Sequence, residues 1–229
     1  MDKQKFYVVG TPIGNMEDIT YRAVMVLGEV DLVLCEDTRV TKNLLNKYNI
    51  STKTFSYPSD NMATDTKMDY ILKMVEEGKT LALVSDAGTP TISDPGSVLV
   101  AKIKEVYPEV EIIAIPGPSA VISALSISGL NVAEFTFLGF LPHKKGRETL
   151  FKEIAVSERV NVFYESPHRI LKALESLIKF APNKKVTIAR ELTKVFEQII
   201  SGTPAEVLEY FTKNSDKVRG EFVVIVSTN

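Results

Sequence analysis

The stretch 80–96 constrains the fold of this chain more than any other segment. Thr80 and the four apolar residues 81–84 predict a short buried strand. The residues after them are rich in Asp, Gly, Thr and Pro, which cannot continue a strand. Asp94 and Pro95 have the chemistry of an N-cap and a first helical residue, which predicts a helix through about Tyr107. This order predicts an open α/β sheet with a ligand crevice at the carboxyl ends of its strands.

The loop between this strand and this helix has two interpretations. It is either an ordinary connection of about ten residues or a ligand-binding loop. Connections in α/β units are commonly shorter, and long ones are more often functional. We therefore predict a ligand loop here.

Apolar runs alternate with helical patterns along the first half of the chain, which predicts a mainly parallel sheet with covering helices. Asn15 followed by Asp18 resembles a capping box before the first helix. The expected strands are 6–9, 32–36, 54–57, 81–84 and 111–115, and the expected helices are about 16–28, 41–48, 63–78 and 96–107.

Pro116-Gly117-Pro118 is the densest cluster of breakers and predicts a hinge between two α/β domains, 1–116 and 117–229. The second domain has more strands per residue, which favours a mixed sheet. Ser166-Pro167 and Thr203-Pro204 have the chemistry of helix starts. The expected strands are 135–139, 161–164, 186–189, 196–200 and 222–226, and the expected helices are about 119–129, 147–155, 167–180 and 204–212.

The composition excludes several classes of protein. With 229 residues, 45% of them hydrophobic, the chain can bury a sizeable core. Its 27 Lys and Arg against 29 Asp and Glu give a net charge of −2, so any contact with nucleic acid needs a local basic patch. The single cysteine, Cys35, excludes an intrachain disulfide and is expected in the core. No run of 18 apolar residues occurs, so we expect a soluble cytoplasmic protein without a membrane contact.

The turn Gly10–Asn15 lies where a nucleotide-binding loop would lie. Its glycines are four residues apart, however, and Pro12 removes an N–H donor, which argues against NAD even though Glu36 would suit a ribose hydroxyl. The turn therefore predicts a ligand loop of another kind. Two histidines without ligand spacing and one cysteine argue against a metal site.

Charged clusters follow several of the other strands. Glu36–Arg39 is either a solvated turn or a carboxylate pair facing the Asp86 loop, since parallel strands end at the same edge of a sheet. Leu141–Arg147 is either a solvated basic loop or a flexible lid or phosphate clamp, which would position a polyanion without reading its bases. Polar clusters also lie at 164–169 and 189–194.

Together these segments resemble the ribosomal RNA small subunit methyltransferase I family, a branch of the tetrapyrrole methylase superfamily. The resemblance covers essentially the whole chain, and it is specific because its motifs occur in order. The motifs are Thr11-Pro12-Ile13-Gly14-Asn15, Glu36-Asp37-Thr38-Arg39, Ser85-Asp86-Ala87-Gly88-Thr89-Pro90, Asp94-Pro95-Gly96, Pro116-Gly117-Pro118, Gly139-Phe140-Leu141-Pro142, Phe163-Tyr164-Glu165-Ser166, His168-Arg169, Ala189-Arg190-Glu191-Leu192-Thr193-Lys194 and Lys217-Val218-Arg219-Gly220-Glu221.

The resemblance implies two α/β domains with S-adenosylmethionine in the cleft between them, usually in a homodimer. It implies methyl transfer to the ribose 2′-hydroxyl of a cytidine in small-subunit (16S) ribosomal RNA, either free or in the assembled 30S subunit. By the family pattern, the cofactor would contact Pro12, Asp86, Ala87, Gly88, Ser119, Ala120, Phe163, Tyr164 and Ala189.

The chain departs from the family pattern in two places. Members typically have His-x-His-Asn at the third strand end, where this chain has Tyr57-Pro58-Ser59-Asp60-Asn61 and keeps only the asparagine. Many members also continue past the position of Asn229 with a basic helical segment. Two other functions therefore stay open, a methyltransferase acting on a tetrapyrrole and a non-catalytic RNA-associated protein. The basic loop 144–147 favours RNA.

The reagent indicates the mechanism. A sulfonium is an activated leaving group, so the protein mainly has to hold the hydroxyl in line with the methyl group while a base takes the proton. The base candidates are Asp37, Glu165 and Glu191, and Lys144 or Arg190 would stabilise the developing oxyanion. The candidates for contact with RNA are Arg39, Lys144, Lys145, Arg147, His168 and Arg169.

Overall fold

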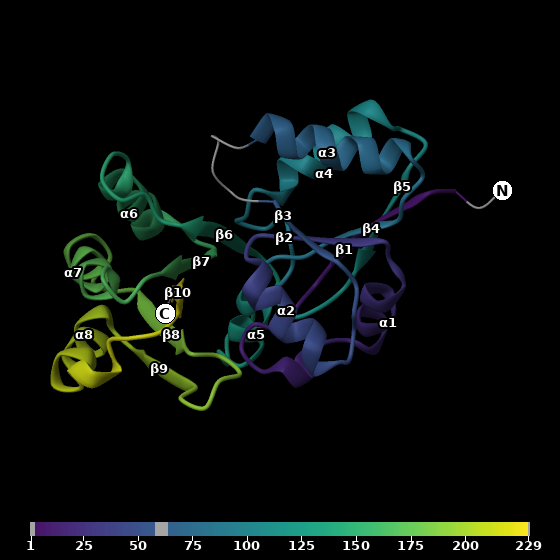
Figure 1. The fold of residues 1–229 in the computed structure, drawn as a ribbon. Coiled ribbons are helices and arrows are strands. Elements are labelled where there is room, and N and C mark those ends of the chain that lie inside the picture. The colour runs from purple at the N-terminus through teal and green to yellow at the C-terminus, as the bar shows by residue number, and fades with distance from the viewer. Residues whose placement is uncertain (1–2, 58–63, 229) are drawn as a thin grey trace. The chain divides into compact units, whose positions relative to one another are not determined.

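The computed structural model describes residues 3–57 and 64–228, which form two compact units (Figure 1). Unit 1 is Met1–Ser119 and unit 2 is Ala120–Asn229. The division predicted at 116/117 lies within the last residues of unit 1. Asn61, on which the His-x-His-Asn comparison depends, and the expected helix start at residue 63 lie outside the described residues.

Unit 1 contains a five-stranded parallel sheet in the order β3-β2-β4-β1-β5, as the alternation of strands and helices predicted. Side chains alternate between two cores, so that Leu34 packs with α3 and α4 while Cys35 packs with α1 and α2. The helices therefore cover both faces of the sheet (Figure 1). The strands are β1 (Lys5–Val9), β2 (Leu32–Cys35), β3 (Thr54–Ser56), β4 (Leu81–Leu83) and β5 (Glu111–Ile115), and the helices are α1 (Tyr21–Glu29), α2 (Thr38–Lys47), α3 (Thr64–Glu76) and α4 (Gly96–Val106).

The continuous helix predicted over 16–28 is wrong. The chain instead forms a short 3-10 turn, η1 (Met16–Asp18), and then begins α1 after Thr20. Thr20 is the N-cap of α1, because its hydroxyl accepts a hydrogen bond from the backbone N–H of Ala23 at 3.2 Å. Asn15 caps the 3-10 turn through the N–H of Glu17 rather than forming the expected box with Asp18.

Unit 2 contains a five-stranded mixed sheet in the order β6-β7-β10-β8-β9, again as predicted. β6 and β7 are parallel, and the other neighbours are antiparallel. The helices α6, α7 and α8 lie side by side and share one hydrophobic core with the sheet (Figure 1). The strands are β6 (Phe135–Phe140), β7 (Val160–Glu165), β8 (Lys185–Arg190), β9 (Gln198–Gly202) and β10 (Phe222–Ser227), and the helices are α5 (Ala120–Ser126), α6 (Arg147–Val156), α7 (Ile170–Phe180) and α8 (Pro204–Lys213).

Several boundaries in unit 2 differ from the prediction, and α5 ends at Ser126 rather than at about residue 129. Residues 166–169 form a separate turn, closed by the N–H of Arg169 donating to the carbonyl of Ser166, so α7 begins at Ile170 and not at Pro167. The ninth strand begins at Gln198, two residues later than expected, because the chain first turns through hydrogen bonds from Thr193 to Glu197 and from Glu197 to Lys194. The start of α8 at Thr203-Pro204 is a complete capping box, as predicted.

Candidate functional site

The loops after β1, β4 and β5 meet at the carboxyl edge of unit 1. Thr11 and Gly88 exchange two backbone hydrogen bonds, at 2.9 and 3.1 Å, which join the loop after β1 to the loop after β4. Gly10 and Gly117 lie against each other so closely that a Cβ on Gly10 would come within 2.7 Å of the Cα of Gly117. The packing of these loops therefore requires backbone without side chains at both positions.

Gly88 has a left-handed backbone conformation, with φ at +84°. Its surroundings are formed by the side chain of Ile13 and the carbonyl of Pro118, and that carbonyl also accepts a hydrogen bond from the Thr89 hydroxyl at 3.3 Å. The cofactor candidates Pro12, Asp86, Ala87, Gly88 and Ser119 all lie on these joined loops.

The carboxylates at the ends of β2 and β4 lie together, as predicted for neighbouring parallel strands. The N–H of Asp37 donates to Oδ1 of Asp86 at 3.1 Å. Burial raises the pKa of Glu36, and the charge of Asp86 raises it further. Arg39 forms an ion pair with Asp37 at 2.7 Å, and this hydrogen-bonded partner lowers the pKa of Asp37 to about 2.

The loop 91–94 carries backbone strain beside these carboxylates. Thr91 and Ser93 have φ values of +75° and +64°, which are unfavourable for residues other than glycine. Asp94 holds the loop, because its carboxylate accepts hydrogen bonds from the N–H of Thr91 at 2.6 Å and of Gly96 at 2.7 Å. α4 begins at Gly96, as expected, but its N-cap position is occupied by Pro95 rather than Asp94, and the Asp94 carboxylate accepts the hydrogen bond from Gly96.

The carboxyl ends of β7 and β8 lie at one edge of unit 2. Both Glu165 and Arg190 align with Phe222 in the sheet register, one on each side of β10. The loop after β6 reaches the same edge, since β6 runs parallel to β7. This edge therefore gathers the predicted polar clusters of the second half of the chain.

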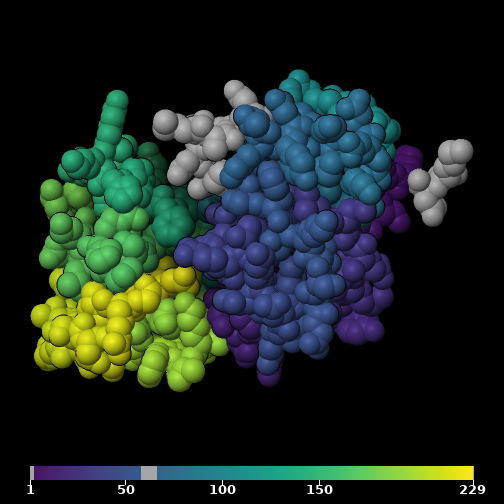
Figure 2. Space-filling view, in the orientation of Figure 1, coloured from purple at the N-terminus to yellow at the C-terminus, as the bar shows by residue number. Residues whose placement is uncertain are grey.

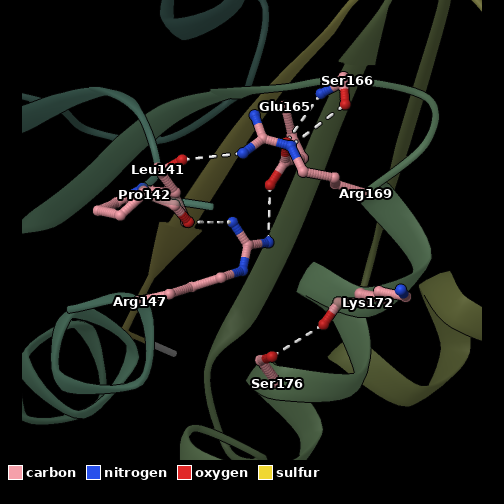
Figure 3. Close-up of polar contacts among 8 residues, drawn as sticks. All are labelled: Leu141, Pro142, Arg147, Glu165, Ser166, Arg169, Lys172 and Ser176. Atoms are coloured by element: carbon pink, nitrogen blue, oxygen red, sulfur yellow. Dashed lines mark hydrogen bonds and ion pairs between the residues drawn. The ribbon is translucent and has the colours of Figure 1, made fainter. Parts of the chain in front are cut away.

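Glu165 is a buried carboxylate that binds two arginines (Figure 3). One oxygen accepts a hydrogen bond from Arg147 at 2.7 Å, and the other forms an ion pair with Arg169 at 2.8 Å and accepts from the N–H of Ser166 at 2.9 Å. The guanidinium groups also donate to the carbonyls of Pro142 and Leu141. The carboxylate side chain is fully covered, whereas the two arginine side chains are 14% and 16% exposed, so the cluster carries one net positive charge close to the surface.

Arg190 and Glu191 are held at the end of β8 by different partners. The buried Arg190 guanidinium donates to the carbonyls of Arg219 at 2.8 Å and Phe196 at 3.1 Å. Burial acts to raise the pKa of Glu191, but hydrogen bonds from Lys194 and the N–H of Glu221 outweigh it and lower the pKa. Both side chains fix the backbone around this edge.

The cofactor candidates of unit 2 differ in accessibility. Phe163 points into the core beneath α6–α8, so a ligand contact there would involve its backbone, whereas Ala189 is buried on the opposite face of the sheet, the face of Tyr164. Tyr164 is half-buried beside the rings of Phe137 and Phe140, with centroids 5.1 and 5.2 Å away, and burial raises its pKa. Ala120 is the first residue of α5.

A basic groove of about 600 Å³ lies between α7 and the start of α6. Figure 3 shows several of its side chains, and Figure 2 shows α6 and α7 as the teal-green and green segments of unit 2. The groove contains three of the predicted RNA candidates, Lys144, Arg147 and Arg169, whereas Arg39 is in unit 1. Lys145 and His168 are exposed but do not line the groove. The residues that line this α6–α7 groove are His143, Lys144, Arg147, Arg169, Lys172, Glu175, Ser176 and Lys179.

The sequence analysis missed Lys172 and Lys179. They could have been found from the spacing of polar residues along the helix. Positions 169, 172, 176 and 179 are separated by three or four residues and therefore share one helical face. Glu36 was not predicted as a carboxylate with a raised pKa, because the shift depends on burial and on Asp86 and Asp94 of the loop after β4.

Two classes of site have no support in the part of the chain that the structure describes. Among residues 3–57 and 64–228, no group of three or more His, Cys, Asp or Glu side chains could hold a metal ion. None of the helices in these ranges is long and apolar enough to cross a membrane.

Comparisons with known proteins agree with this architecture. The family model described as Tetrapyrrole (Corrin/Porphyrin) Methylases matches residues 5–208. The chain is 45% identical to the Thermotoga maritima protein named Ribosomal RNA small subunit methyltransferase I, over 97% of this chain and 98% of that protein. It is 44% identical to the protein of the same name from Halalkalibacterium halodurans, over 100% of this chain and 77% of the relative.

Solved structures of similar fold are more distant in sequence. A cobalt precorrin-4 methyltransferase matches 98% of this chain and 95% of its own, with a TM-score of 0.70 and 17% identity. Uroporphyrin-III C-methyltransferase from Thermus thermophilus matches 98% of this chain and 94% of its own, with a TM-score of 0.67 and 16% identity. At these identities, the two structures establish the fold alone.

Proposed function

The chain belongs to the ribosomal RNA small subunit methyltransferase I family of tetrapyrrole methylases, and on this premise we propose that it methylates the ribose 2′-hydroxyl of a cytidine in small-subunit ribosomal RNA. S-adenosylmethionine is the methyl donor. The observation that carries the proposal is the 45% identity to the Thermotoga maritima relative, which extends over nearly all of both chains.

The loop chemistry and the charge of the carboxyl edge of unit 1 support a cofactor site there. Its joined loops present backbone and small residues, as a site must where a ligand approaches the main chain closely. Asp86 and Asp94 lie on the loop after β4 and interact electrostatically with Glu36 at the end of β2, which makes the edge negative. S-adenosylmethionine carries a sulfonium and an ammonium group, so its cationic part is complementary to this edge.

When bound, the cofactor supplies an electrophilic methyl group on a good leaving group. The chain's own residues have to bind the ribose, exclude water and remove the proton of the hydroxyl. Glu36 is the base candidate whose pKa is raised, towards the range in which a general base works best. We assign this role to Glu36 before Asp37 and Glu191, because both of those have lowered pKa values.

At the edge of unit 2, we assign positioning roles to Glu165, predicted as a base, and to Arg190, predicted as an oxyanion stabiliser. One oxygen of Glu165 accepts a hydrogen bond from Arg147, and the other accepts from the N–H of Ser166 and pairs with Arg169, so we assign this residue to positioning the two guanidinium groups. Arg190 donates to two backbone carbonyls and positions the end of β8. Lys144 is exposed at the groove and is the remaining candidate for stabilising the oxyanion.

The test uses purified protein, S-adenosylmethionine with a labelled methyl group, and RNA from cells that lack the gene. Free 16S RNA and assembled 30S subunits are separate substrates. We expect labelled 2′-O-methylcytidine in the nucleoside digest, measured by mass spectrometry, and none with Gly88→Val. Label in a tetrapyrrole substrate instead of RNA, or RNA binding without turnover, would each contradict the proposal.

We further propose that the protein is a cytoplasmic homodimer, as the family resemblance implies. Sedimentation equilibrium at micromolar concentration gives the mass of the particle directly. A mass equal to that of one 25.4 kDa chain would contradict the dimer.

A further inference from the structure

We propose that the α6–α7 groove binds consecutive phosphates of an RNA strand, with Lys172 and Lys179 of α7 as contacts outside the methyl-transfer machinery. The inference rests on the proposed function, because it takes the substrate to be RNA. It adds a substrate-binding surface that extends along α7 from the edge of unit 2.

One end of the groove is a fixed positive charge. Arg147 and Arg169 share the single carboxylate of Glu165 and are each held by a backbone carbonyl as well (Figure 3). These contacts keep the guanidinium groups in one geometry while 14% and 16% of their side chains stay exposed. A phosphate bound at this end would therefore contact guanidinium groups that are already fixed, so binding loses little side-chain conformational entropy.

The wall formed by α7 continues the positive charge away from that end. Lys172 and Lys179 are exposed, and both line the groove together with Ser176. From Arg169 to Lys179 the helix rises about 15 Å, at 1.5 Å per residue. The lysines thus form a row long enough for several successive phosphates of one strand, which are about 3.4 Å apart along a duplex axis.

The opposite wall is the loop that leads into α6. Lys144 is exposed on this loop. Gly146 is the N-cap of α6 and has φ at +85°, a left-handed conformation in which the loop turns into the helix. In total, five Lys or Arg side chains face the groove against two carboxylates, those of Glu165 and Glu175. The whole chain has a net charge of −2, so this excess is local.

The arrangement favours a polymer over a single small anion. A site for one phosphate gathers its donors around one point, whereas these cations are distributed along a helix. Exposed lysines are point charges on flexible stems, which suits contact with a backbone without base readout. Inorganic phosphate is therefore the comparison ligand.

The test is a salt titration of RNA affinity with unmethylated 30S subunits as the probe. Replacing both lysines, Lys172→Ala with Lys179→Ala, should reduce the slope of log affinity against log salt by roughly 1.5, at 0.7 to 0.9 per lost phosphate contact. KM for RNA should rise with kcat unchanged, and the affinity for S-adenosylmethionine should stay the same. The double replacement by Arg should keep the slope of the wild type.

A matched control removes two exposed lysines elsewhere, Lys104 on α4 and Lys185 at the opposite end of β8. Lys104→Ala with Lys185→Ala should leave the slope unchanged, and thermal melting confirms that all variants fold. An unchanged slope in the Lys172 and Lys179 variant overturns the inference. Saturable binding of inorganic phosphate that disappears in that variant, with RNA affinity intact, overturns it as well.

The titration also separates this inference from the proposed function. If the wild type binds 30S subunits through the groove but transfers no methyl group, the proposed function fails and the groove stands. If the wild type methylates RNA while the variant binds it with an unchanged slope, the groove fails and the proposed function stands.

Discussion

The carboxyl edges of the two sheets are held together by different interactions, backbone contacts in unit 1 and ion pairs in unit 2. In unit 1, backbone hydrogen bonds and glycine contacts join the loops, and the charged groups among them are the carboxylates of Glu36, Asp86 and Asp94. In unit 2, ion pairs around the buried Glu165 hold the edge, and cations line the groove beside it. The two edges therefore differ in charge, with carboxylates at the edge of unit 1 and an excess of cations in the groove of unit 2.

The difference has consequences for stability as well as binding. A backbone-built edge tolerates the loss of a charge but not the addition of a side chain. An edge built on a buried carboxylate behaves in the reverse way, because removing one partner leaves buried charges uncompensated. Each of the following variants tests one side of this contrast.

Glu165→Gln should have the largest effect. The amide cannot neutralise Arg147 and Arg169, whose side chains are only 14% and 16% exposed, so unit 2 should lose about 3–5 kcal/mol of unfolding free energy. Urea unfolding followed by circular dichroism measures the loss. Glu134→Gln is the matched control, since Glu134 pairs with Arg159 where both side chains are more than half exposed, and it should cost under about 1 kcal/mol. Equal effects of the two variants would show that the buried cluster does not hold the edge.

Gly88→Val tests the backbone-built edge of unit 1. At φ +84° a β-branched residue is strained by about 1–2 kcal/mol, and its Cβ would contact Ile13 at 3.4 Å. We expect at least a tenfold loss of affinity for S-adenosylmethionine by calorimetry, with the salt slope for RNA unchanged. Gly28→Val is the matched control, because Gly28 lies in α1 with open space around it. Cofactor affinity equal to that of the wild type would place the cofactor elsewhere.

The local features of this contrast were predictable from sequence, and the long-range ones were not. Breaker residues and apolar runs are local signals, so they located most strands and the loops after β1 and β4. Strand direction then correctly brought Asp37 to Asp86, 49 residues apart. The ion pair between Arg147 and Glu165 depends instead on how a turn, a strand end and a helix pack together, which no short spacing encodes.

Helix starts show the same limit at a smaller scale. Thr20 interrupts the helix expected over 16–28 because a threonine hydroxyl can cap the following turn, and the apolar periodicity carries no sign of that competition. Lys172 and Lys179 share one face of a predicted helix, so their spacing could have indicated the groove. The cluster of cations at 144–147 indicates only the loop, because it is the densest in the sequence.

Asp94→Ala should have a smaller effect within unit 1. The carboxylate caps α4 through the N–H of Gly96 and holds the strained Thr91, so its loss should cost about 1–2 kcal/mol. For a chain of this size, that corresponds to a melting temperature lower by roughly 2–8 °C. Asp94→Asn keeps one acceptor oxygen and should recover part of the loss. A melting temperature unchanged by Asp94→Ala would mean that the loop is held without this cap.

The smallest expected effect is a change in the unfolding free energy with pH, which has opposite signs for Glu36 and Glu191. Burial and the charge of Asp86 raise the pKa of Glu36, so its contribution to the unfolding free energy is fully present below the usual glutamate pKa of 4.5 and is lost as pH rises through the folded value. Glu191 has a lowered pKa, because hydrogen bonds from Lys194 and Glu221 outweigh burial, so its contribution is present above 4.5 and is lost as pH falls. From pH 4 to pH 7, the wild type should therefore lose stability relative to Glu36→Gln and gain stability relative to Glu191→Gln.

Urea unfolding of the three proteins across this range measures both differences in unfolding free energy. The contributions of the other carboxylates are common to the wild type and each variant, so they cancel in each difference. Differences of the same sign would contradict the contrast between a carboxylate edge in unit 1 and a cation-held edge in unit 2.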